Sequence, residues 1–195
     1  EKIPRRLARP QKKPLPSDVE IKIILQKVSA AKKYEDLTRF LVRVGRRIEE
    51  ASLYEKNDVV KGLDGRPIAI KVRPEITKTK ETGEIPLDDE LCELVGKASQ
   101  KSPRSPHLIV NPDGSKVAQN TYREFLKGLC QEAKITIITP HCFRYYVVNK
   151  LLNAGINPKD SMAITGHVDI QSFMSYVKST EEGRQKALAA TKIIF

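Results

Sequence analysis

The chain has 195 residues, of which 39% are hydrophobic and 30% are charged, and its 35 Lys and Arg residues outnumber its 24 Asp and Glu residues. A chain of this length suits one ordinary domain with a hydrophobic core and excludes two large domains. It contains no run near the roughly 18 apolar residues that a membrane-spanning helix needs, so no membrane association is expected. The formal net charge of +11 indicates either a polyanionic partner, most often nucleic acid, or a merely basic soluble protein.

Cysteine and aromatic content narrow the classes further. Cys92, Cys130 and Cys142 are widely spaced, with no Cys-x-x-Cys pair, which favours a reducing compartment over a disulfide framework or a structural zinc site. Aromatic residues make up 6% of the chain and Trp is absent, so contact with duplex phosphates is favoured over stacking on single-stranded bases. The positive charge is also clustered, because residues 133–159 contain four Lys or Arg residues and no acidic one.

The first segment, residues 1–16 (EKIPRRLARPQKKPLP), has six basic residues, one acidic residue and four prolines. This proline density excludes a regular helix and favours an extended arm. The arm is either a disordered tail or an interdomain linker that lies along DNA phosphates and implies a further domain upstream. As a linker, its candidate phosphate-binding residues are Arg5, Arg6, Arg9, Lys12 and Lys13.

Two helices and a sheet are expected next. Residues 17–20 (SDVE) have the pattern of a capping box that begins a helix. Apolar residues then follow at helical spacing, at Ile21, Ile24, Leu25 and Val28. The same spacing predicts a second helix, around Leu37, Phe40, Leu41 and Val44. From about residue 66 the period shortens, and the stretches RPIAIKVRP and TGEIPL predict a small β-hairpin or meander.

Helical patterns return after Asp88 and over about 118–131, separated by the apolar run HLIV and the turn NPDGS. Pro140 suits the start of another helix, which would end with Gly155 in a left-handed conformation. Its expected core face is Phe143, Val147 and Leu151, with Leu152 as a further candidate.

Asn157 and Pro158 suit the N-cap and first position of a further helix. A last one is marked by Ile170, Phe173 and Val177. The sequence therefore predicts one domain over residues 17–195, mainly α with a small antiparallel β-sheet (α+β).

Candidate chemical groups lie in the second half of the chain. His141 and Arg144 would share one face near a helix N-terminus, where backbone amides favour an anion such as a phosphate diester; two solvated polar residues are the alternative. His167 follows a glycine in the sequence ITGH. Tyr176 lies one turn after Phe173 at the edge of the apolar stripe, either as a half-buried core residue or as a nucleophile beside a base or cation.

Two further groups lie upstream. In GRRIEE, an arginine held by Glu50 would form a rigid bidentate clamp for phosphate. In TKTKETGEIPL, Lys78 is expected on or near the hairpin tip, either solvated or able to give a proton to a leaving oxygen.

In order and spacing these motifs resemble the catalytic domain of the tyrosine recombinase family, which includes phage integrases and Xer-type recombinases. That family has an Arg within G-x-R-x-x-E, a β-hairpin Lys, H-x-x-R, G-H and a nucleophilic Tyr about nine residues later. This chain has GRRIEE, TKTKETGEIPL, HCFR, GH and SFMSY. The resemblance covers residues 1 to about 180, because the arm is similar to that family's linker from an N-terminal core-binding domain, which is not within this chain.

The resemblance implies six catalytic residues, with Glu50 in support: Arg47, Lys78, His141, Arg144, His167 and Tyr176. Arg47 is assigned because it lies three residues before Glu50, and Lys78 because it lies eight residues before Pro86, with Lys80 in reserve. The chain departs from the family twice, with Arg46 in place of a hydrophobic residue and Tyr145 in place of the His that follows the second catalytic arginine.

The resemblance also implies a mechanism without nucleotide, metal or other cofactor. Tyr176 would attack a backbone phosphate of duplex DNA, form a 3′-phosphotyrosyl link and release a 5′-hydroxyl. Arg47 and Arg144 would hold the non-bridging oxygens. Lys78 would protonate the leaving oxygen, His141 would assist proton transfer from the tyrosine, and His167 would donate a hydrogen bond to the phosphate.

The family resemblance implies a homotetramer on two DNA sites, in the nucleoid-associated cytoplasm of a prokaryote. The C-terminal stretch EGRQKALAATKIIF, ending in Ile193, Ile194 and Phe195, would either pack on a neighbouring protomer or fold back on its own core. Two other functions stay open: a type IB topoisomerase, with the same chemistry but no synapsis, and a non-catalytic DNA-binding module.

Overall fold

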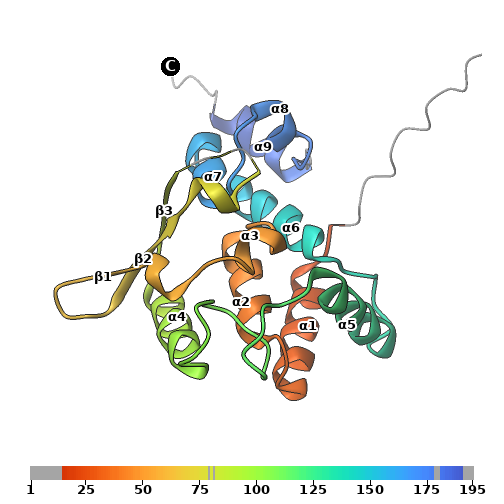
Figure 1. Ribbon diagram of the computed structural model, residues 1–195. Helices are drawn as coiled ribbons and strands as arrows, with labels where there is room; N and C mark the ends of the chain where they lie inside the picture. Colours follow the sequence, from red (N-terminus) through yellow and green to blue (C-terminus); the bar gives the residue numbers. More distant parts are fainter. Residues whose placement is uncertain (1–14, 79, 81, 178–180, 191–195) are drawn as a thin grey trace, which may run out of the picture.

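Figure 1 shows the computed structural model, which describes residues 15–78, 80, 82–177 and 181–190. The helices are α1 (Asp18–Ala31), α2 (Glu35–Val44), α3 (Ile48–Ala51), α4 (Asp89–Lys101), α5 (Gln119–Glu132), α6 (Pro140–Asn153), α7 (Pro158–Thr165), α8 (Ile170–Met174) and α9 (Glu181–Ala190). The strands are β1 (Val59–Lys61), β2 (Pro67–Val72) and β3 (Gly83–Pro86), with short 3-10 turns at Lys56–Asp58 and Pro74–Ile76. The predicted α+β class, mainly helical with one small antiparallel sheet, is confirmed.

Helix α2 lies in the middle of the fold and packs against α1, α3, α4 and α6. Its apolar face, with Phe40 fully buried, forms much of the core. Thr38 on the same helix shares a 2.8 Å hydrogen bond with Tyr122 Oη, which links α2 to α5. Gly45 ends α2 with a φ of 69°, and a Cβ there would lie 2.9 Å from Val147 Cβ. Glycine at this position therefore allows the chain to turn tightly against α6 and enter α3.

The antiparallel sheet has the order β1-β2-β3 and packs through β2 against α4. Ile70 in the central strand is paired with Val59 on one side and Ile85 on the other. Of the expected hairpin or meander, the structure forms a meander, whose first strand, β1, precedes the residues on which that expectation rests. Three residues are too few to show the alternation on which strand prediction depends.

The predicted helix ends depend on local capping, and they agree with the structure. Ser17 and Glu20 form the capping box: the Glu20 amide donates to Ser17 Oγ at 3.2 Å and the Ser17 amide donates to Glu20 Oε2 at 2.8 Å. After α6, Gly155 has a φ of 78°, and the amide of Ile156 donates to the carbonyl of Leu151. This Schellman-type ending was expected from the glycine.

Two predictions of core faces need correction. Leu151 and Leu152 are only half-buried, while α6 buries polar residues such as Arg144 and Asn149. Helix α6 lies between α2 and α7, so it buries most of its circumference rather than a single apolar stripe. Ile170 is exposed, because α8 is only five residues long and only Phe173 on it is buried.

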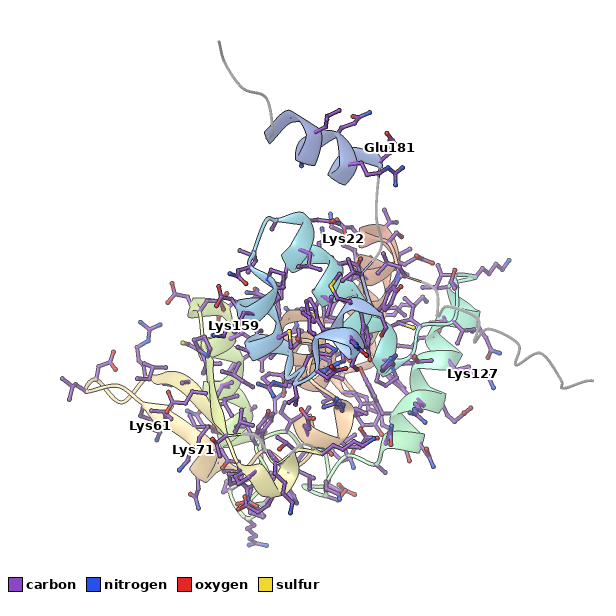
Figure 2. The ribbon with its side chains drawn as sticks, turned by 90° about the horizontal axis from the view of Figure 1, so that it is seen from above. Lys22, Lys61, Lys71, Lys127, Lys159 and Glu181 are labelled. Carbon is purple, nitrogen blue, oxygen red and sulfur yellow. The ribbon has the colours of Figure 1, made fainter. Side chains whose placement is uncertain are left out.

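Parts of both chain ends lie outside the described residues. Residues 1–14, which include all the predicted DNA-contact residues of the arm, and residues 191–195 lie outside the described part of the chain. Helix α9 projects away from the domain body (Figure 2), and Leu188 on it is 74% exposed. Among the described residues, no helix is both long enough and apolar enough to cross a membrane.

Positive charge is spread over several elements of the surface. The lysines labelled in Figure 2 come from helices and from the sheet, and all five are exposed: Lys22, Lys61, Lys71, Lys127 and Lys159. These five lysines therefore do not single out one face.

Candidate active site

Five of the six predicted catalytic residues come together from the ends of α3, α6, α7 and α8. Arg47 is the N-cap of α3, and His141 and Arg144 lie in the first two turns of α6. His167 follows the C-terminal end of α7, and Tyr176 follows α8. Residues up to 129 positions apart in the sequence (47 to 176) thus lie close together at the ends of four helices.

Arg144 forms the buried centre of the cluster and is 1% exposed. Its Nε donates to His167 Nε2 at 3.1 Å, and its Nη2 donates to the carbonyl of Gly166 at 3.0 Å. Its Nη1 donates to the carbonyls of Gly45, at 3.0 Å, and Thr165. Burial and the neighbouring cation of Arg47 lower the pKa of Arg144 to about 10, so it stays charged at neutral pH.

The C-terminal end of α7 provides the negative potential that gathers the arginines. Arg46 donates to the carbonyls of Ala163 at 2.9 Å and Ile164 at 2.8 Å. Arg144 donates to the next two carbonyls, those of Thr165 and Gly166. The last carbonyls of a helix lack intrahelical partners and lie at the negative end of its dipole. Four consecutive carbonyls therefore accept from arginines, which explains how three guanidinium groups can assemble around a single carboxylate, Glu50.

Gly166 is required at this helix end for two reasons. Its φ is 69°, a left-handed conformation that glycine adopts without steric cost. A Cβ at this position would also lie 2.2 Å from Nη1 and 2.9 Å from the Cζ atom of Arg46. The glycine of the Gly-His pair thus makes room for the buried guanidinium of Arg46.

The two adjacent arginines, Arg46 and Arg47, differ in their exposure and in their partners. Arg46 is buried, with Nη1 3.8 Å from Glu50 Oε2. Arg47 donates to Glu50 Oε1 at 2.7 Å and remains partly exposed. It lines a hollow of about 120 Å³ together with His141 and Arg144. Arg46 also borders this hollow, but its side chain is 5% exposed against 28% for Arg47, so Arg47 is the more accessible of the two.

Tyr176 lies with its hydroxyl 2.9 Å from His141 Nε2. Its ring contacts those of His141, Tyr145 and His167, with centroid distances of 5.1, 5.6 and 4.9 Å. The guanidinium carbon of Arg144 lies 5.9 Å from the ring centroid. The phenol is thus next to a base and within the field of a buried cation, the two features that activate a tyrosine nucleophile.

His167 is a neutral, internally bonded histidine. Arginine Nε can only donate, so His167 Nε2 accepts and the ring proton is on Nδ1. Nδ1 then donates to Thr165 Oγ1 at 2.8 Å, whose hydroxyl donates to the carbonyl of Ser161 at 2.7 Å. Burial, followed by the cation of Arg144, lowers the pKa of His167 to about 3. The expected hydrogen bond from His167 to phosphate stays a prediction, and it requires one of these partners to be exchanged.

Lys78 is not brought into the cluster. It is exposed on the connection between β2 and β3, as is Lys80, which has a φ of 53°. The structure also adds residues to the site that the sequence motifs did not indicate. Gln119 and Arg123 of α5 line the same hollow as Arg47. Their spacing of four residues on a polar helix face was the available signal, but it did not distinguish them from other solvated residues.

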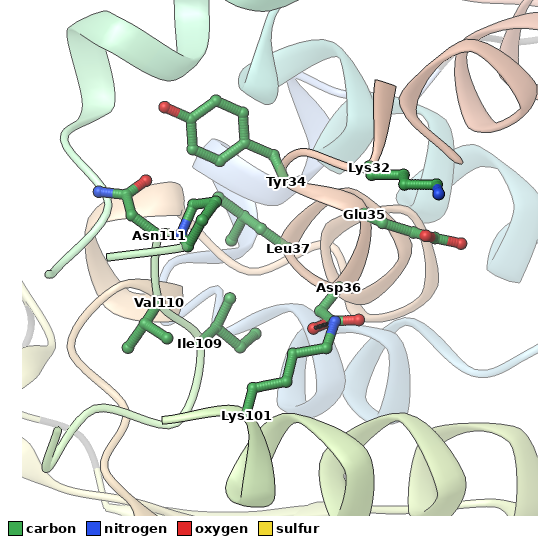
Figure 3. A pocket seen from close by; sticks show the side chains of 10 residues that line it. Lys32, Tyr34, Glu35, Asp36, Leu37, Lys101, Ile109, Val110 and Asn111 are labelled. Atoms are coloured by element: carbon green, nitrogen blue, oxygen red, sulfur yellow. Dashed lines mark hydrogen bonds and ion pairs between the residues drawn. The ribbon is translucent and has the colours of Figure 1, made fainter. Parts of the chain in front are cut away.

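Another hollow, of about 340 Å³, lies at the opposite end of α2 (Figure 3). Its lining includes Tyr34 and Leu37, and Lys101 is paired there with Asp36. It contains none of the predicted catalytic residues, and its charges largely compensate one another. Despite its size it is therefore a weaker candidate for the functional site than the arginine cluster.

Comparison with known proteins places these features in a family. Residues 18–182 match the model of the phage integrase family. The tyrosine recombinase XerD of Oceanobacillus iheyensis is 30% identical over 96 residues, which cover 49% of this chain and 32% of that protein. This matched region thus spans about a third of the length of the relative.

Solved structures share the fold. The crystal structure of XerA recombinase covers 100% of this chain and 70% of its own, with a TM-score of 0.74 and 18% identity. The Tn1549 transposon integrase, solved in complex with circular intermediate DNA, covers 92% of this chain and 67% of its own, with a TM-score of 0.69 and 16% identity. Since the family match extends over most of the chain, this protein belongs to the phage integrase family, the tyrosine recombinases.

Proposed function

We propose that this domain cleaves and rejoins duplex DNA at specific sites through a 3′-phosphotyrosyl intermediate formed by Tyr176. The observation that carries this proposal is the 2.9 Å hydrogen bond between Tyr176 Oη and His141 Nε2, made beside two arginines. A nucleophile in contact with a base, next to cations that suit a phosphate, is the arrangement that such chemistry needs.

In the cleavage step, Tyr176 Oη bonds to phosphorus as its proton passes to His141 Nε2. The bond from phosphorus to the 5′-oxygen breaks, and that oxygen receives a proton from a lysine. Religation reverses both transfers with a new 5′-hydroxyl, so the energy of the broken ester is retained. His141 is well placed for this role, because its Nε2 already contacts the hydroxyl that must lose its proton.

The two arginines that we assign to the phosphate, Arg47 and Arg144, make unequal contributions to its binding. Arg144 has used four of its five N–H donors on the protein. Arg47 donates through Nη1, and its Nε and Nη2 have no partner among the residues that the structure describes. Arg47 therefore supplies the bidentate fork for two non-bridging oxygens, and Arg144 supplies mainly buried positive charge beside the side chain of Tyr176. Loss of Arg47 should slow cleavage about a hundredfold or more, as for the loss of an oxyanion-hole donor.

We assign the leaving-group proton to Lys78, with Lys80 as the alternative. Both are exposed on the β2–β3 connection, so DNA binding has to bring this connection to the phosphate. Gln119 and Arg123 of α5 extend the polar surface from the hollow and would contact the neighbouring DNA backbone. The basic arm of residues 1–16 would continue that contact as a linker along the phosphates.

The assembly and location follow from the same function. Lambda integrase, which has this fold, was crystallised as a tetramer bound to a Holliday junction. In the present chain α9 projects from the domain and exposes Leu188, which suits packing on a neighbouring protomer. We place such a tetramer on DNA in the nucleoid-associated cytoplasm of a prokaryotic host, with no cofactor required.

The test begins with supercoiled plasmid, because it requires no knowledge of the target site. Wild-type protein should leave relaxed plasmid with covalently bound protein after detergent, and Tyr176→Phe should leave neither. Tyr146→Phe is the matched control, because Tyr146 lies on α6 and its hydroxyl is hydrogen-bonded to Asp18, away from the cluster. If the Tyr176→Phe variant still forms the adduct, the assigned nucleophile is wrong.

Two other functions give different results. A type IB topoisomerase would relax plasmid but would not exchange strands between two marked duplexes. A non-catalytic DNA-binding module would bind DNA equally well as wild type and as Tyr176→Phe, and neither protein would cut the DNA.

A further inference from the structure

Asn149 is a buried polar residue that the proposed chemistry does not use. It lies on α6 and is 5% exposed. Its Nδ2 group donates to the carbonyl of Tyr145 at 2.8 Å and to the carbonyl of Tyr176 at 2.7 Å. An amide nitrogen has two hydrogens, so a single side chain connects the helix that carries His141 to the backbone of the nucleophile.

Asn149 is the last of three α6 residues that contact Tyr176. His141, Tyr145 and Asn149 are spaced four residues apart, so they form a row along one face of the helix; we call this row the α6 stripe. His141 meets the hydroxyl of Tyr176, Tyr145 meets its ring, and Asn149 binds its carbonyl. Tyr176 therefore lies lengthwise along α6, with its hydroxyl toward the start of the helix and its backbone two turns further on.

The segment that carries Tyr176 has few other anchors among the described residues. Helix α8 is five residues long, and Phe173 is its one fully buried side chain. Ile170 and Met174 are about half exposed. The amide of Tyr176 donates to the carbonyl of Phe173 at 3.0 Å, which is a local contact within the same turn. The contact with Asn149 is a polar link that reaches from this segment to the rigid core of the domain.

We propose that Asn149 is a positioning residue, which holds the backbone of Tyr176 so that its hydroxyl stays against His141 before DNA is bound. This inference rests on the proposed function, and it extends that function to a residue outside the catalytic set. Tyr145, where the chain departs from the family pattern, supports the same alignment through its ring. The nucleophile is thus set by the α6 stripe rather than by α8 alone.

The predicted effect is on the rate of cleavage and not on DNA binding. In Asn149→Ala the carbonyl of Tyr176 loses its partner, and the segment exchanges between aligned and displaced positions. Because one buried hydrogen bond is lost and the carbonyl of Tyr176 is left without that donor, the rate constant for adduct formation should fall about 5- to 30-fold. DNA affinity, measured by gel shift, should change less than twofold, because Asn149 does not reach the hollow lined by Arg47.

Three variants separate positioning from folding. Asn149→Ala removes both donors. Asn149→Asp keeps the shape and regains a donor only when the carboxyl is protonated, so its rate relative to wild type should rise as the pH falls from 8 to 6. Asn153→Ala is the matched control, an exposed asparagine one turn further along α6. A folding defect would reduce the amplitude of adduct formation and DNA binding together, whereas a positioning defect reduces the rate constant at full amplitude.

A second measurement needs no catalysis. Hydrogen exchange of the amides of residues 173–177 in the free protein should accelerate about 5- to 30-fold in Asn149→Ala and remain unchanged in Asn153→Ala. If the wild type forms no adduct but this exchange still accelerates, the proposed function fails and the anchor stands. If the wild type forms the adduct and Asn149→Ala matches it in both rate and exchange, the anchor is refuted and the proposed function stands.

Discussion

Replacing Arg46 by Ala gives the sharpest test of how this site is assembled. The change removes a buried guanidinium that donates to the carbonyls of Ala163 and Ile164 and lies 3.8 Å from Glu50 Oε2. Two carbonyls at the end of α7 then lose their partners, and Glu50 keeps its ion pair with Arg47. Removal of one partner from a buried ion pair costs about 3–5 kcal/mol, and each orphaned buried carbonyl about 1–3 kcal/mol by itself.

Water can enter the space left by Arg46 and donate hydrogen bonds to the two exposed carbonyls. We therefore expect the cost of the broken ion pair alone, without the added cost of the carbonyls. The free energy of unfolding should fall by about 3–5 kcal/mol, which for a chain of this size lowers Tm by roughly 6–20 °C. Arg46→Lys, with a single ammonium group that cannot serve both carbonyls in the same fork, should fall between the wild type and Arg46→Ala.

The assay is urea unfolding followed by circular dichroism, with equal m-values required for the comparison. Arg43→Ala is the matched control, because Arg43 lies on the same end of α2 and is ion-paired with Asp88 and Glu90, but its side chain is 36% exposed. Exposed pairs contribute about 0.2–1 kcal/mol. If Arg46→Ala loses no more than Arg43→Ala, the view that Arg46 secures the end of α7 is wrong.

Three further changes test other parts of the site. His167 has a pKa of about 3 in the folded protein against an ordinary value of 6.5, so between these pH values only the unfolded chain gains a proton. The free energy of unfolding should therefore decrease as the pH falls from above 6.5 to 4, by up to about 3 kcal/mol more in the wild type than in His167→Gln. Urea titrations at each pH measure this difference. Gly166→Ala forces a Cβ onto Arg46 and should cost at least about 1–2 kcal/mol through its left-handed φ alone, measured as a lower Tm. Lys78→Ala should slow cleavage of ordinary DNA but not of DNA with a 5′-sulfur leaving group, which needs no proton; if Lys80→Ala behaves this way instead, the lysine assignment changes.

These predictions separate two layers of the site. His141, Tyr176 and Arg47 face the hollow or each other and are expected to affect cleavage with little effect on folding. Arg46 and His167 face the protein interior and should affect stability first. Arg144 belongs to both layers, because a side chain that is 1% exposed is also next to the hollow.

Local sequence determined where the helices begin and end, because capping is decided by neighbouring residues. Ser17 with Glu20, Pro158 after Asn157, and Gly155 after α6 each satisfy backbone groups within a few residues of themselves. The identity and order of the catalytic motifs were also visible in the sequence, since residue type and spacing are local properties.

Tertiary structure alone decided which of these residues meet and what each one faces. Arg46 and Arg47 are adjacent in sequence and both border the hollow, yet Arg46 is buried against the end of α7 and Arg47 is partly exposed. Their fates depend on where α7, more than 110 residues later, places its free carbonyls. The row from His141 to Asn149 likewise becomes a support for Tyr176 only when α8 lies along α6, and β1 becomes a strand only beside β2. Hydrogen bonds between distant segments and burial between packed helices carry no signal in the spacing of residues, so only the folded chain reveals them.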